Sequence, residues 1–325
     1  MSEKFVESHA DEAREVVENS EQAAIVGVTT PKKDAVERMS RRKLLWRRFK
    51  RNKTAIVGLV GLILVILLAV LGPVFSPWEF TKSDRTAFLK PPSPQHWFGT
   101  NSGGYDMFAM TVEGLRKSLL IGFIVAGLQT TIAALVGASA AFFGSWFDKL
   151  ALWVVDLLLV IPSFLIIAII TKSAAGTNNS VWFLIILLAA FGWMLSARVV
   201  RSLTLSVRSL DYVTAAKFMS VPSFSIIVRH ILPNISSLLI IDATLGVASA
   251  VLGETALSYF GFGVQAPEVS LGTLIAAGQP KAPTHPWTFL PPAAVLTLAL
   301  VCVNFVGDGV RDALDPSSKS AGGKA

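Results

Sequence analysis

Long apolar stretches recur along this chain and constrain its fold more than any other feature. They run to roughly 18 residues or more, enough for a helix to cross a hydrocarbon core about 30 Å thick. Only 16% of the residues are charged, against about 25% in a typical soluble domain, and the mean hydropathy is +0.58. The charged faces that a large soluble helical protein would need between these stretches are missing. The sequence therefore predicts an all-α integral membrane protein, folded as a polytopic helix bundle.

The apolar stretches predict about six transmembrane helices. Their expected ranges are 54–75, 118–143, 150–171, 181–200, 236–251 and 287–306. Pro162 interrupts the third of these ranges. The stretch TALSYFGFGV, which follows the fifth range, has two interpretations: it extends that helix, or it re-enters the membrane.

Polar segments separate the predicted helices and divide the chain. Residues 1–38 have mixed charge and little apolar periodicity, which predicts a disordered cytoplasmic tail. A polar, proline-rich segment at 76–117 follows the first span and is expected outside the cytoplasm. Residues 118–310 form the expected core domain, which contains an inner loop at 201–235. Residues 311–325 form a second cytoplasmic tail.

A basic segment, RRKLLWRRFKRNK, lies immediately before the first span. Its cations alternate with apolar side chains, among them Trp46 and Phe49. This spacing predicts a basic amphipathic juxtamembrane helix at 39–53, lying on the lipid bilayer with its cations facing anionic head groups. A second interpretation, in which the cations act only as a stop signal for insertion, remains open.

The distribution of lysine and arginine predicts the orientation. Cytoplasmic segments of membrane proteins carry an excess of both residues. With the amino terminus inside, the inner segments hold 22 of the 29 lysines and arginines, and the outer segments hold seven. Both termini and the loop 201–235 are therefore expected in the cytoplasm. The same clustering beside the first span explains the net charge of +7 without a nucleic-acid partner.

The loop 201–235 contains a polar stretch, DYVTAAKFMSVPSFSIIVRHILP, that is capable of forming a helix. Asp211 is expected to cap its start, and Ser220 and Pro222 are expected to end it after roughly two turns. A short exposed helix with small and aromatic side chains suits insertion into a groove on a partner. The pattern fits equally well a helix that only packs against its own bundle.

This stretch resembles the cytoplasmic coupling loop of bacterial ABC-importer permeases, whose pattern is E-A-A, three residues, G, and a spacer that ends in L-P. Thr214 stands where that family usually has glutamate, and Ser220 where it has glycine. The resemblance implies that the loop contacts the ATPase. The candidate ATPase-coupling residues are Asp211, Tyr212, Thr214, Ala215, Ala216, Phe218, Ser220, Leu232 and Pro233.

Five further motifs, in order along the chain, are similar to the dipeptide/oligopeptide/nickel branch of that family. They are LWRRFKRNKTAIVGLVGL, HWFGTNSGGYDMF, DLLLVIPSFLIIAI, GETALSYFGFGVQAP and GDGVRDALDP. Together they resemble the C-type, second permease subunit. The resemblance implies the ABC importer type I permease fold, in a multi-pass protein of the bacterial cytoplasmic (inner) membrane.

The resemblance also implies partners and a cargo. The expected partners are a second homologous permease, two ATPase subunits or domains that bind ATP and Mg, and an extracytoplasmic peptide-binding protein. The chain would form half of a translocation pathway for peptides. Nickel chelates and haem remain open as cargoes. Alternatives from other classes are a proton-driven secondary carrier and an integral-membrane enzyme.

The sequence lacks the motifs of a nucleotide-hydrolysing or metal-dependent enzyme. It contains no G-x-x-x-x-G-K-[ST] phosphate-binding loop. The single cysteine, Cys302, lies in an apolar run, and the four histidines show no metal-ligand spacing. No nucleophile–base set stands out. The chain is therefore predicted to be a transport subunit with no catalytic residue, bound cofactor or metal.

Five polar residues lie in or near the predicted spans. They are Gln129, Asp156, Asp242, Glu254 and Asn304. A charge within a membrane is costly and usually faces a cavity or a partner. Asp156 and Asp242 are expected to pair with arginine or to reach the interface. Glu254 and Gln129 are candidates for lining the pathway.

Overall fold

The computed structural model describes residues 41–173 and 180–314. The chain forms two compact units, residues 1–44 and 45–325. The predicted tail at 1–38 lies outside the described residues, as does most of the tail at 311–325. The second unit contains all of the predicted spans. Its described residues are helical apart from connecting segments and two isolated bridges near residue 105.

The helices of the described chain follow one another as an all-α bundle. Their bounds are α2 Arg41–Arg51, α3 Lys53–Phe75, α4 Met107–Phe143, α5 Ser145–Val160, α6 Ser163–Ser173, α7 Ser180–Gly192, α8 Met194–Val207, α9 Asp211–Phe218, α10 Ser223–Ile226, α11 Leu232–Asn234, α12 Ser236–Tyr259, α13 Leu271–Gly278 and α14 Leu290–Leu314. A π-helical turn, Ile227–Ile231, joins α10 to α11.

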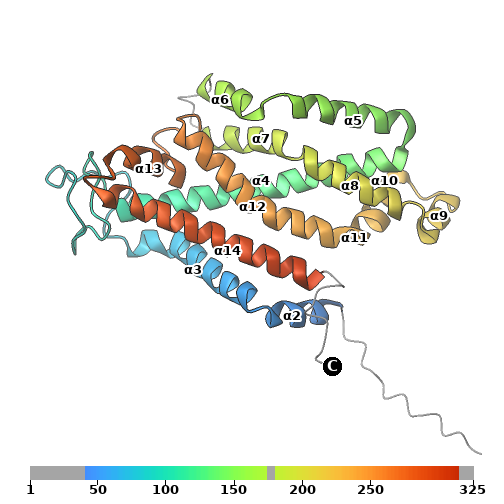
Figure 1. Ribbon diagram of the computed structural model, residues 1–325, viewed down its shortest axis with the longest axis horizontal. Coiled ribbons are helices and arrows are strands. Elements are labelled where there is room, and N and C mark those ends of the chain that lie inside the picture. Colours follow the sequence, from blue (N-terminus) through green and yellow to red (C-terminus); the bar gives the residue numbers. More distant parts are fainter. Residues whose placement is uncertain (1–40, 174–179, 315–325) are drawn as a thin grey trace, which may run out of the picture. The chain divides into compact units, whose positions relative to one another are not determined.

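Helix α4 is the central element of the bundle. It has 37 residues and packs against α3, α8, α12 and α14. Figure 1 shows α4, α12, α14 and α3 running alongside one another. These four helices are long and apolar enough to cross a membrane by themselves. The small residues of α4, such as Ala133, Gly137 and Ala141, are buried, which allows neighbouring helices to approach closely.

The third and fourth predicted spans are bent helix pairs. Helices α5 and α6 meet at 75°, and α7 and α8 meet at 44°. Pro162 lies between α5 and α6, where its missing N–H and its ring interrupt the helix. The predicted spans at 150–171 and 181–200 therefore each contain a break between two helices. Counting each bent pair as one span gives up to six spans, as predicted.

Several predicted boundaries also change. Helix α4 begins at Met107 rather than 118, because Asp106 caps it by accepting a hydrogen bond of 2.8 Å from the amide of Ala109. The polar residues of its first three turns concealed this start. Helix α12 continues to Tyr259, so TALSY extends the fifth helix. The sixth helix runs from Leu290 to Leu314 rather than from 287 to 306.

The basic segment before the first span is helical, as predicted. Helix α2 ends at Arg51, and Asn52 then caps α3 through a side-chain contact of 3.2 Å with the amide of Ala55. Trp46 is half exposed, and the ammonium group of Lys50 lies 5.2 Å from its ring centroid. This cation–π contact keeps an aromatic and a cationic side chain together on an exposed face.

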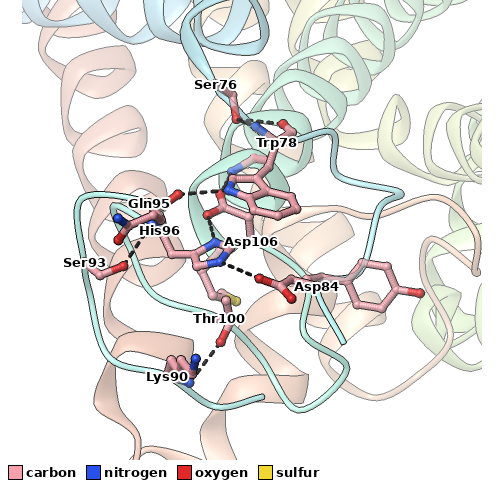
Figure 2. Close-up of polar contacts among 12 residues, drawn as sticks. Ser76, Trp78, Asp84, Lys90, Ser93, Gln95, His96, Thr100 and Asp106 are labelled. Atoms are coloured by element: carbon pink, nitrogen blue, oxygen red, sulfur yellow. Dashed lines mark hydrogen bonds and ion pairs between the residues drawn. The ribbon is translucent and has the colours of Figure 1, made fainter. Parts of the chain in front are cut away.

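The segment between α3 and α4 is organised around a buried histidine (Figure 2). One ring nitrogen of His96 lies 2.9 Å from Asp106, and the other lies 3.5 Å from Asp84. The Trp78 ring stacks on the imidazole at 4.8 Å. Hydrogen bonds from Thr86 are the main reason that the pKa of Asp84 lies below its usual value. This acid–base cluster could not be predicted from the sequence, because Asp84, His96 and Asp106 are widely spaced along the chain.

We expect Asp106→Ala to destabilise this segment by about 2 to 3 kcal/mol, because α4 loses its cap and one ring nitrogen of the buried His96 loses its partner. Asp106→Asn should retain most of the stability, because its amide oxygen can still cap α4. Limited proteolysis between residues 76 and 106 would measure the difference. Equal cleavage rates for Asp106→Ala and the unmodified protein would contradict this account of the segment.

Candidate functional site

The candidate site is the segment between α8 and α12, which contains α9, α10, the π-helical turn and α11. Figure 1 shows α9 at one end of the bundle, with the segment 76–106 at the opposite end. Leu210 is the residue that precedes the first turn of α9, and no side chain caps this helix. The predicted cap by Asp211 is therefore wrong. Asp211 is instead the first helical residue, where its negative charge interacts favourably with the positive end of the helix dipole.

One face of α9 packs into the protein's own core. Val213 and Ala216 are 0% and 1% exposed and join a cluster with residues of α4, α8 and the π-helical turn. Ala216 is one of the candidate coupling residues. Its small side chain allows close packing within this chain, because the helix turns that face inward. Lys217 adds a further link, since its ammonium group lies 4.7 Å from the ring centroid of Phe142 at the end of α4.

The opposite face of α9 is exposed and apolar at its end. Phe218 and Met219 are 85% and 72% exposed, and Phe224 in α10 is 66% exposed. Thr214 and Ala215 are also exposed. Large apolar side chains gathered on a surface mark an interaction site more often than isolated ones do. We call Phe218, Met219 and Phe224 the apolar tip.

Ser220 has the backbone conformation that ends α9. Ser220 has φ of 56°, in the left-handed region that favours glycine. Its amide bonds to the carbonyl of Lys217, and the amide of Val221 bonds to the carbonyl of Ala216. These two bonds form a Schellman motif, in which glycine is the usual residue at the left-handed position. The serine therefore keeps the turn at a cost of about 1 kcal/mol.

The segment that contains Leu232 and Pro233 contacts the start of α9. Asn234 donates a hydrogen bond to the hydroxyl of Tyr212, and the ring centroids of Tyr212 and His230 lie 6.5 Å apart. Leu232 packs against the cluster that holds Val213. The structure thus brings the two halves of the predicted coupling loop together, although the residues are about twenty positions apart.

The two candidate pathway residues are engaged within the chain. Glu254 is 0% exposed, and its carboxylate accepts hydrogen bonds from Ser118 at 3.0 Å and Ser258 at 2.6 Å. It joins α4 to α12 within this chain. Gln129 is partly buried and donates to the carbonyl of Leu188 at 2.9 Å, close to the bend between α7 and α8.

Acidic side chains also connect α5, α8 and α12. Asp156 pairs with Arg198, which agrees with one of the two expectations for this residue. Asp242 accepts from Ser196 at 2.6 Å and from Thr130 at 3.1 Å, so its partners are hydroxyl groups rather than an arginine. These contacts give the polar groups hydrogen-bond partners, which lipid could not provide. Among the described residues, no group of histidine, cysteine, aspartate and glutamate could hold a metal ion.

Two protein-family models match this chain. A family model described as "Binding-protein-dependent transport system inner membrane component" matches residues 130–320, which include the apolar tip. The chain belongs to this family of transport permeases. A second model, "N-terminal TM domain of oligopeptide transport permease C", matches residues 40–92 of the permease.

Curated relatives resemble this permease over nearly their whole length. The oligopeptide transport system permease protein OppC of Mycobacterium tuberculosis (strain ATCC 25618 / H37Rv) is 52% identical over 281 residues, which cover 86% of this chain and 96% of that protein. OppC of Bacillus subtilis (strain 168) is 35% identical, over 86% of this chain and 92% of its own. A putative peptide permease of Brucella suis is 37% identical, over 84% and 90%.

Family membership makes this permease a transport subunit and not an enzyme. The predicted family is confirmed, and so is the all-helical permease fold. The predicted residues of the coupling loop lie together, but Met219 and Phe224 were not among them. Their signal in the sequence was apolar character on the side of α9 and α10 away from Val213, and it becomes clear only once the buried face is known.

Proposed function

We propose that this chain is the C-type permease subunit of an ATP-binding-cassette importer that takes up oligopeptides. The observation that carries the proposal is the 52% identity to a protein named as an oligopeptide permease, over most of both chains. The match of residues 40–92 to the amino-terminal domain of such permeases supports the C-type assignment.

The proposal includes a set of partners. A second, homologous permease completes the pathway, and an extracytoplasmic peptide-binding protein delivers the cargo. Two ATPase subunits bind ATP and Mg on the cytoplasmic side and receive the apolar tip in a groove. The inner segments of the predicted topology hold 22 of the 29 lysines and arginines, which supports this orientation, with both termini in the cytoplasm.

The packing of α9 supports a mechanical role. Val213 and Ala216 share one core cluster with residues of α4 and α8, and Lys217 contacts the Phe142 ring. A displacement of the apolar tip therefore moves packed helices rather than a loose loop. When the ATPases close on ATP, α9 transmits this motion, and the two permeases exchange inward-facing and outward-facing states.

Uptake by the reconstituted complex tests this function. Proteoliposomes that contain both permeases, the ATPases and the binding protein should accumulate a labelled oligopeptide only when ATP is supplied on the side of the ATPases. Liposomes that lack this chain should not. Uptake that follows a proton gradient without ATP, or that carries nickel chelates or haem and no peptide, would overturn the proposal.

A further inference from the structure

A cavity with a mixed polar and apolar lining lies where the first membrane span ends and α4 begins. Its volume is about 660 Å³, within the range of small-molecule sites. The last turn of α3, the segment Ser76–Lys82 and the first turns of α4 line it. The side chains that matter for binding are Trp78, Glu79, Phe80, Lys82, Glu113 and Arg116.

The cavity offers two acidic and two basic side chains, so its lining is neutral overall. Lys82 lies 2.8 Å from Glu79, and both side chains are about two-thirds exposed at 66% and 64%. Arg116 is 62% exposed and lies 3.9 Å from the more buried Glu113. Exposed ion pairs contribute little stability, so a ligand that carries both charges can replace them at small cost.

The position of the cavity indicates the environment of its ligand. It borders Pro73 and Ser76, where the apolar run of α3 gives way to polar chain. Val70, Val74 and Phe75 are 61%, 77% and 67% exposed on the last two turns of α3. Trp78 and Phe80 follow at the level where aromatic side chains concentrate at a membrane–water interface.

We propose that this cavity binds the head group of a zwitterionic phospholipid that carries a primary amine, phosphatidylethanolamine. Lys82 and Arg116 receive the phosphate, and Glu79 and Glu113 receive the ammonium group. The acyl chains lie along the exposed apolar side chains at the end of α3. A free peptide also carries an ammonium group and an anion, but it has no acyl chains to cover that surface. The lipid therefore fits both parts of the site.

Lipid retention by the full-length protein tests the proposal. The permease is placed in nanodiscs with equal amounts of phosphatidylethanolamine, phosphatidylcholine and phosphatidylglycerol, and the lipids that stay bound are identified by native mass spectrometry. Phosphatidylethanolamine should be retained preferentially. The Lys82→Gln/Arg116→Gln variant should lose at least about tenfold in that retention, because the loss of either charge-assisted hydrogen bond alone has about that effect.

Two further variants keep the test decisive. Arg85→Gln removes an exposed cation from the same segment but outside the cavity and should leave retention unchanged. Glu79→Lys makes the lining positive and should shift the preference toward phosphatidylglycerol. Equal retention of the three lipids, no effect of the double variant, or displacement of the lipid by oligopeptide at the concentrations that support uptake would each overturn the proposal. Peptide uptake itself is a separate measurement, so the cargo assignment stands or fails independently.

Discussion

A Phe218→Asp variant of this permease is expected to insert and fold normally but to lose its ATPase subunits on purification. Phe218 is 85% exposed, so the substitution removes little packing within the chain. If a groove of the ATPase surrounds this ring, truncation removes an aromatic anchor and buries a carboxylate in its place. Losses at such positions are about 2 to 4 kcal/mol, or roughly 30- to 1,000-fold in affinity.

A matched control lies at the other end of the bundle. Phe88 is also an exposed phenylalanine, at 54%, in the segment between α3 and α4. Phe88→Asp should leave ATPase recruitment unchanged. Ala216→Arg is not a suitable test, because that side chain is buried and the arginine would disrupt the core. Normal ATPase co-purification with Phe218→Asp would remove the apolar tip from the interface.

The second large effect is expected at Gly137, in the contact between α4 and α8. A Cβ at this position would collide with the carbonyl oxygen of Ala197 and lie 3.1 Å from the amide nitrogen of Arg201. Both are backbone atoms of α8, which cannot rotate away as a side chain can. Gly137→Val should therefore separate the helices and reduce stability by roughly 3 kcal/mol. Because α8 leads directly into α9, coupling should fail with it.

Gly127 provides the control on the same helix. A Cβ there meets nothing within 4 Å, so Gly127→Val changes the helix without a clash. Thermal unfolding in detergent and the amount of protein in the membrane would compare the two variants. Equal stability of Gly137→Val and Gly127→Val would contradict the close α4–α8 contact.

Much of the fold could be predicted because the membrane restricts the choice. Lipid cannot satisfy backbone hydrogen bonds, so a long apolar run has to become a helix. Pro162 lies in the third predicted span, but the 75° bend there depends on how α6 packs against α7. The start of α4 was missed because Glu113, Arg116 and Lys117 resemble a loop in composition, although Asp106 caps a helix there.

The candidate site could be located from the sequence, but which face of α9 is buried and which is exposed could not be predicted. The family pattern marked α9 and has glycine at the position of Ser220, where φ is 56°. The helix phase that buries Ala216 and exposes Phe218 depends on contacts with α4 and α8. Glu254 shows the same limit, because its hydroxyl donors come from residues 118 and 258, and only the packed bundle brings them together.

Site-specific crosslinking at the apolar tip tests the central claim most directly. A photoreactive residue replaces Met219, which is 72% exposed, in the permease as it is assembled in native membranes. The account predicts one major adduct, with an ATPase subunit, whose yield changes when ATP is added. The same residue at position 88 should give no such adduct. Adducts at position 219 with lipid alone, or with the permease itself and no ATPase subunit, would contradict the coupling role of α9.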